Sequence, residues 1–71
     1  MRIYSVEDLG KEIRIERKRA GLTQRELARA CRVGVRFISD LENGKPTVEF
    51  ARALLVTNVL SMDLSIDRRG A

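Results

Sequence analysis

The sequence predicts an all-α domain of four to five short helices with a single β-strand at its C-terminal end. Apolar residues recur at the helical period through most of the chain, and capping residues and glycines divide them into short segments. Near the C-terminus the pattern changes to strict alternation, which is typical of a strand. The 71 residues suffice for one domain, residues 1–71, whose small core makes a stabilising dimer interface worth expecting.

The first helix is predicted to begin after Ser5. The Ser5 hydroxyl can accept a hydrogen bond from an early backbone N–H group, and the carboxylate of Asp8 suits the positive end of the helix. Gly21 is expected to end this helix in a left-handed conformation. The expected inward face consists of four apolar residues: Val6, Leu9, Ile13 and Ala20.

Residues 23–43 are predicted to form two further helices joined by a short turn. Thr23 and Glu26 have the spacing of a capping box at the start of the second helix. The helical pattern stops at residues 32–34, then resumes and closes at Asn43-Gly44. The expected inward residues are Leu27, Ala28 and Cys31 in the second helix, and Phe37, Ile38 and Leu41 in the third. This arrangement predicts a helix-turn-helix unit.

A fourth helix is predicted to start at Pro46-Thr47, with Thr47 as its N-cap. Its expected inward residues are all apolar: Val48, Ala51, Leu54, Leu55 and Val59.

Residues 62–67 are predicted to form a strand, because Met62, Leu64 and Ile66 alternate with polar residues. The sequence contains no other convincing strand, and a lone strand leaves its backbone donors and acceptors unpaired. We therefore expect this strand to pair with the same strand of a second copy, antiparallel across the two-fold axis of a homodimer. A frayed C-terminal segment is the alternative.

Positive charge is concentrated in one part of the chain. The net charge is +4, and residues 11–36 alone carry nine basic and three acidic side chains, which leaves the remainder with a net negative charge. Such a block indicates an anionic partner, such as the DNA backbone or an acidic protein. A solvated helix face is the alternative explanation.

The composition argues against catalysis, metal binding and membrane insertion. The chain has no His and one Cys, and we find no cluster of metal ligands and no nucleophile beside a base. Cys31 is expected to pack in the core rather than to sense redox state. The longest apolar run, residues 53–56, is far short of a membrane span. We therefore expect a cytoplasmic protein that is not an enzyme, with no cofactor, metal or membrane partner.

Two motifs give the chain a resemblance to the Xre/Cro-type helix-turn-helix family. They are GLTQRELA at residues 21–28 and ISDLENGK at residues 38–45, and the resemblance extends from residue 9 to residue 60. The segment LSMDL at residues 60–64 resembles the HipB-like antitoxin branch. The resemblance implies a lambda-repressor-like fold in a bacterial regulator, with a terminal strand that pairs across the dimer.

The sequence departs from the family pattern at two positions in the turn. Arg32 stands where the family usually has Gly, and Gly34 stands where it usually has Ser or Thr. A left-handed Arg32 costs roughly 1 kcal/mol, so these departures put the placement of the third helix in doubt.

The third helix is expected to lie in the major groove of DNA with its N-terminal residues at the base edges. The expected base-reading residues are its outward positions: Gly34, Val35, Arg36, Ser39 and Asp40. Arg36 can bind O6 and N7 of guanine, and Val35 can touch a thymine methyl group. Asp40 can accept from cytosine N4, or it can form an ion pair with Arg36 four residues earlier.

The phosphate backbone is expected to meet the start of the second helix and the end of the third. The candidates are Thr23, Gln24, Arg25 and Lys45. Two alternatives stay open, namely that Thr23 serves only as a cap and that Lys45 is only solvated. The resemblance implies a partly buried salt bridge between Arg17 and Glu42, and we expect no reading role for either residue.

The predicted function is that of a transcriptional repressor which binds a palindromic double-stranded operator as a homodimer. The resemblance further suggests an antitoxin that represses its own operon and binds a HipA-like kinase toxin. A stand-alone Xre-type regulator is one alternative. A protein-interaction module that has lost DNA binding is another, favoured by Arg32, Gly34 and Asp40.

Overall fold

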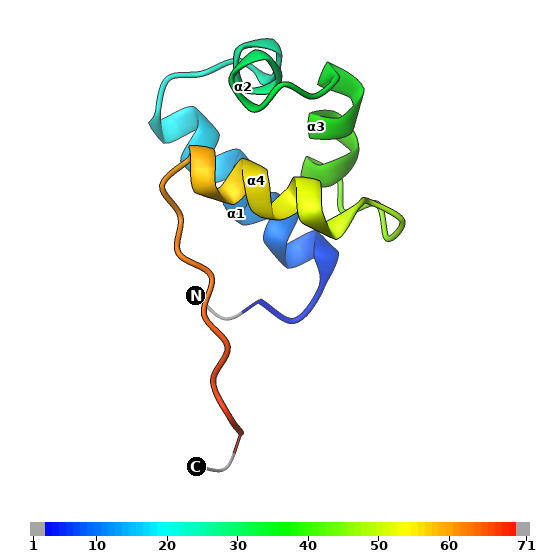
Figure 1. Ribbon diagram of the computed structural model, residues 1–71, viewed down its shortest axis with the longest axis vertical. Helices are drawn as coiled ribbons and strands as arrows, with labels where there is room; N and C mark the ends of the chain where they lie inside the picture. Colours follow the sequence, from blue (N-terminus) through cyan, green and yellow to red (C-terminus); the bar gives the residue numbers. More distant parts are fainter. Residues whose placement is uncertain (1–2, 70–71) are drawn as a thin grey trace.

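The computed structural model describes residues 3–69, and it contains four α-helices within this range. The helices are α1 (Val6–Arg19), α2 (Gln24–Cys31), α3 (Val35–Glu42) and α4 (Phe50–Val59). Figure 1 shows α2 and α3 at one end of the molecule, α4 crossing in front of α1, and the C-terminal segment projecting away from the helices at the opposite end. The predicted all-α class is confirmed.

The start of α1 follows the prediction. The Ser5 hydroxyl accepts a hydrogen bond from the backbone N–H of Asp8 at 3.1 Å, and the Asp8 carboxylate accepts one from the N–H of Tyr4 at 2.9 Å. The helix ends at Arg19, so Ala20 serves as the C-cap and is exposed rather than inward as expected.

The capping box of α2 is complete. Thr23 accepts from the N–H of Glu26 at 3.0 Å, and Glu26 accepts from the N–H of Thr23 at 2.8 Å. The backbone bond from Thr23 is the largest cause of a lowered pKa for Glu26, since it favours the charged carboxylate. At the start of α3 the N-cap is Gly34, which contributes no side-chain hydrogen bond.

All four helices end in the same way, with a left-handed residue and two closing hydrogen bonds that use the last carbonyl groups. In α3 the N–H of Gly44 bonds to Leu41 O at 3.1 Å and the N–H of Lys45 bonds to Asp40 O at 3.0 Å. The left-handed residues are Gly21, Arg32, Gly44 and Ser61. Arg32, with φ of 57°, therefore adopts the conformation that favours glycine.

The predicted start of α4 was wrong. Thr47 lies in a turn in which the N–H of Val48 bonds to Lys45 O, and the helix begins at Phe50 with Glu49 as its N-cap. The expected inward face was also misplaced, because α4 is apolar on most sides. The residues that it buries are Ala53, Val56 and Thr57, while Ala51, Leu55 and Val59 are exposed and Val48 and Leu54 are half-buried.

The expected strand at residues 62–67 is absent from the described part of this single chain. Met62 completes the end of α4, since its N–H bonds to Thr57 O at 2.9 Å and its side chain packs against the core. Leu64 and Ile66 are exposed, Ile66 fully. A strand needs a neighbouring strand for its backbone hydrogen bonds, and the described part of this single chain contains none.

The core joins all four helices. Five apolar side chains have no exposed surface: Ile13, Leu27, Ile38, Leu41 and Val56. Gly10 lets α1 approach the end of α3 closely, because a Cβ at this position would lie 2.8 Å from Glu42 O. Within residues 3–69, no helix is long and apolar enough to cross a membrane.

Candidate nucleic-acid interface

The helix α3 has one buried side and one exposed side. Ile38 and Leu41 have no exposed surface, whereas Arg36 is exposed and Val35 is 39% exposed. Their spacing places the anchoring residues on the side that packs against α1 and α2. The core therefore fixes α3 so that Val35 and Arg36, at its start, face solvent.

The structure leaves the expected base-reading positions accessible to different degrees. Gly34, Val35 and Arg36 are exposed, while Ser39 and Asp40 are half-buried. The Ser39 hydroxyl accepts from the side-chain amide of Asn43, the C-cap of α3, at 3.5 Å. The first turn of α3 is thus the most open part of the candidate reading surface.

The considered ion pair between Asp40 and Arg36 does not form. Asp40 instead pairs with Lys45, with Oδ2 3.5 Å from Nζ. The end of α3 brings the two residues together, because the N–H of Lys45 bonds to Asp40 O. The Lys45 side chain is 52% exposed in this pair, and Arg36 stays free of the Asp40 carboxylate.

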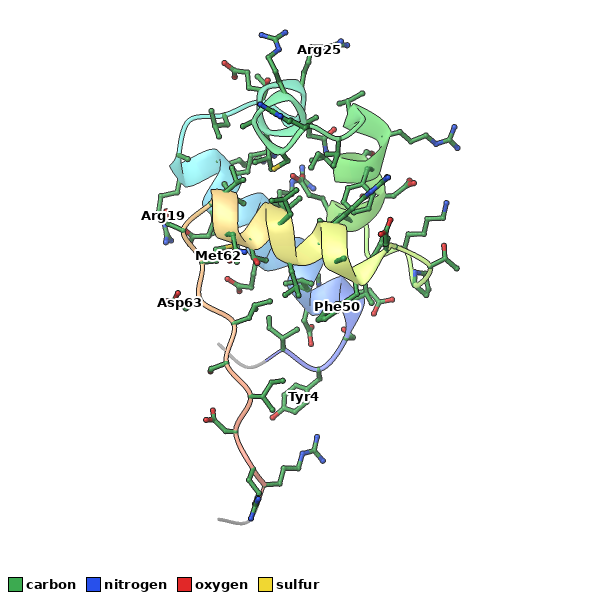
Figure 2. The ribbon with its side chains drawn as sticks, viewed as in Figure 1. Tyr4, Arg19, Arg25, Phe50, Met62 and Asp63 are labelled. Carbon is green, nitrogen blue, oxygen red and sulfur yellow. The ribbon has the colours of Figure 1, made fainter. Side chains whose placement is uncertain are left out.

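The start of α2 combines exposed and anchored side chains. Thr23 and Arg25 are exposed, and Figure 2 shows Arg25 pointing away from the body of the protein at the end remote from the C-terminal segment. Gln24 is half-buried, and its Nε2 donates to Glu42 Oε1 at 3.2 Å. No local sequence pattern signals this bond, because it joins residues 18 apart on different helices.

The ion pair between Arg17 and Glu42, which the resemblance implies, is present and buried. Arg17 Nε lies 2.6 Å from Glu42 Oε2, and Nη2 lies 3.1 Å from Oε1. The remaining guanidinium nitrogen, Nη1, donates to Leu22 O at 2.8 Å. The bond to Glu42 raises the pKa of Arg17, which favours the charged guanidinium.

Several exposed cations lie near this surface without a carboxylate partner. Among residues 3–69, the ion pairs within 4.0 Å engage Arg17, Arg19, Lys45 and Arg52. In α2, α3 and the turn between them, the exposed basic side chains outside these pairs are Arg25, Arg29, Arg32 and Arg36. Their charge is available to an anionic ligand.

Cys31 lies in the core with 2% of its surface exposed. Burial raises the pKa of its thiol, which disfavours the reactive thiolate. Within residues 3–69 no group of His, Cys, Asp or Glu side chains could hold a metal ion.

Comparisons with known proteins agree with this geometry. Residues 8–64 match the family model of the helix-turn-helix domain. The chain is 45% identical over 65 residues to the HTH-type transcriptional regulator y4mF of Sinorhizobium fredii (strain NBRC 101917 / NGR234), and the match covers 92% of this chain and 86% of the relative.

Solved structures of HipB have the same fold. The chain superposes on HipB in a HipB-O4 20mer complex with a TM-score of 0.87, at 23% identity and with 97% of both chains covered. The match to a chain of the HipA-HipB-O2-O3 complex has the same TM-score, identity and coverage. The chain therefore belongs to the helix-turn-helix domain family, and it shares its fold with HipB.

Proposed function

We propose that this protein is a transcriptional repressor that binds a specific double-stranded DNA sequence as a homodimer. One observation carries the proposal: α3 is anchored by fully buried Ile38 and Leu41 and presents Val35 and Arg36 outward from its first turn. This is the presentation that a recognition helix needs in the major groove.

In this proposal Arg36 is the principal base-reading residue. Its guanidinium carries several donors and can bind both O6 and N7 of guanine. Val35 contacts a thymine methyl group, and Gly34 lets the backbone approach the bases closely. Ser39 and Asp40 contact bases further along the groove. The Asp40 carboxylate would there accept from cytosine N4 while it stays paired with Lys45.

Backbone phosphates are bound on either side of α3. At the start of α2, the exposed Thr23 and Arg25 and the half-buried Gln24 surround the N–H groups of a helix end that attracts anions. Lys45 lies at the other end of α3. These contacts position the protein but carry no sequence information.

The C-terminal segment is proposed as the dimer contact. Leu64 and Ile66 are exposed in a single chain, and the segment projects from the end of the molecule opposite α2 and α3 (Figure 1). Pairing residues 62–67 with a second copy would cover these side chains and satisfy the backbone. The dimer would place two recognition helices on a palindrome about one helical turn apart.

The antitoxin role is part of the proposal and rests on the HipB-like fold, which one of the matched structures shows in a complex that contains HipA. In this role the protein represses its own operon and binds a HipA-like kinase toxin. The y4mF relative favours the second candidate, a stand-alone regulator, because it is named only as a transcriptional regulator. Co-expression with the product of the neighbouring gene separates the two, since only an antitoxin co-purifies with a kinase.

Selection of bound sequences from a random DNA pool tests the proposed function. We expect enrichment of one palindromic sequence, and loss of that enrichment in Arg36→Ala. The matched control is Arg52→Ala, which removes the same charge from α4, where Arg52 pairs with Glu49. Equal binding to every sequence would reject specific recognition, and full affinity in Arg36→Ala together with Gln24→Ala would favour a module that has lost DNA binding.

Analytical ultracentrifugation tests the dimer. The truncation should remove residues 63–71 and keep Met62, because Met62 closes the end of α4. We expect the truncated chain to be monomeric, whereas an unchanged dimer would reject the proposed strand pairing.

A further inference from the structure

Glu42, which forms the buried ion pair between α1 and α3, also accepts a hydrogen bond from Gln24 of α2. Glu42 Oε2 accepts from Arg17 Nε, and Glu42 Oε1 accepts from both Arg17 Nη2 and Gln24 Nε2. The Glu42 side chain is 2% exposed, while Gln24 stands at the first position of α2 and is only half-buried. A single carboxylate thus connects the core to the candidate phosphate-binding edge.

The chemistry of this contact fixes the orientation of the Gln24 amide. A carboxylate can only accept hydrogen bonds, so the amide must turn its NH₂ group toward Glu42 and its oxygen away. One hydrogen of Nε2 is engaged, which leaves the second N–H to donate elsewhere. Phosphate oxygens are acceptors only, so this second N–H is the group of the Gln24 side chain that can bind DNA backbone.

Arg17 makes a carboxylate at this place compatible with DNA. Two bonds from its guanidinium neutralise Glu42, which would otherwise repel a nearby phosphate. A third bond from Arg17 to Leu22 O holds the residue just before the α2 N-cap. The same cation therefore fixes the carboxylate and the turn that leads into α2.

We propose that Glu42 is a positioning residue for DNA binding: held by Arg17, it orients the Gln24 amide before DNA arrives, so that its free N–H faces a phosphate. This inference rests on the proposed DNA-binding function, and it assigns the ion pair a role beyond joining α1 to α3. Ordering one side chain in advance is worth roughly a 2- to 10-fold gain in affinity.

Nuclear magnetic resonance of the free protein tests the positioning step without any DNA. Gln24 is the only glutamine in the sequence, so its side-chain amide gives a unique pair of proton signals. We expect these protons to be shifted from the values of an unstructured peptide and to exchange slowly with water. Signals at unstructured values with fast exchange would overturn the proposal.

The matched control for this measurement is Glu16→Ala, which leaves Gln24 as the only glutamine. It breaks the exposed ion pair with Arg19, which has no contact with Gln24. We expect the Gln24 signals to stay unchanged in this variant. In the double variant Arg17→Met and Glu42→Met we expect them to move to unstructured values. Replacing a whole buried ion pair by apolar residues of similar size often leaves stability intact.

A mutant cycle on DNA affinity tests the functional step. Gln24→Ala is measured in the native protein and in the double methionine variant, on the sequence selected from the random pool. We expect a loss of roughly 2- to 10-fold in the native background and of less than about 2-fold in the methionine background. Equal losses in both backgrounds would overturn the positioning role of Glu42. If no DNA binds, the proposed function fails, whereas the amide signals still decide the orientation of Gln24.

Discussion

Removing one partner of the buried ion pair should destabilise the fold severely. In Glu42→Ala, Arg17 loses both acceptor oxygens of the carboxylate, yet its side chain is only 10% exposed. Water cannot readily replace the lost partner, and a buried charge without a partner typically costs about 3–5 kcal/mol. A chain of this length has a total free energy of unfolding of roughly 4–11 kcal/mol, so the loss is a large part of the total.

Thermal unfolding followed by circular dichroism measures this effect. A loss of 3 kcal/mol lowers the Tm of a domain of this size by roughly 12 °C or more. The variants must be compared at one protein concentration, because dimerisation would make the Tm concentration-dependent. The matched control is Glu16→Ala, which breaks an ion pair whose arginine is 71% exposed and should cost less than about 1 kcal/mol.

The double variant Arg17→Met and Glu42→Met separates two explanations. If desolvated charge causes the loss, removing both charges should restore a Tm near that of the native protein. If Glu42→Ala lowers the Tm no more than Glu16→Ala does, the reasoning from burial is refuted.

Three further predictions concern α2, α3 and the turn after α3. Arg36→Ala should reduce discrimination at one base pair by about 1–3 kcal/mol, measured by mobility shifts on the selected sequence and its single-base variants. The folded-state pKa of Glu26 is lowered, so its contribution to stability is present above the unfolded value of about 4.3 and is lost as the pH falls through the lower folded value. In urea unfolding, the difference in stability between the native protein and Glu26→Gln should therefore shrink as the pH falls below the unfolded pKa of Glu26. Gly44→Ala should cost more than the roughly 1–2 kcal/mol of a left-handed residue, since its Cβ would lie 2.6 Å from Glu7 Cγ, whereas Gly21→Ala has open space and should cost only that amount.

The local signals in the sequence predicted the first three helices well. The capping box at Thr23 and the end of α1 at Gly21 depend on neighbouring residues, which a sequence displays directly. Arg32 is left-handed, as its position suggests, because glycine is usual at that position of the family.

The errors lie where non-local packing decides. The start of α4 at Phe50 could not be placed from the sequence. Thr47 has the properties of a cap, but it lies in a backbone turn after α3 in which the N–H of Val48 bonds to Lys45 O. The strand predicted at residues 62–67 is absent from the described part of the single chain, because strand formation depends on a pairing partner that a local pattern does not reveal. The bond from Gln24 to Glu42 depends on how α2 and α3 pack, and only the assembled core brings these residues together.

The most direct test of the account is a map of amide chemical shifts on titration with the duplex selected from the random pool. We expect the largest changes in residues 23–25 at the start of α2 and residues 34–36 at the start of α3. Changes confined to α4 and the C-terminal segment, with the first turn of α3 unaffected, would contradict the claim that α3 reads DNA.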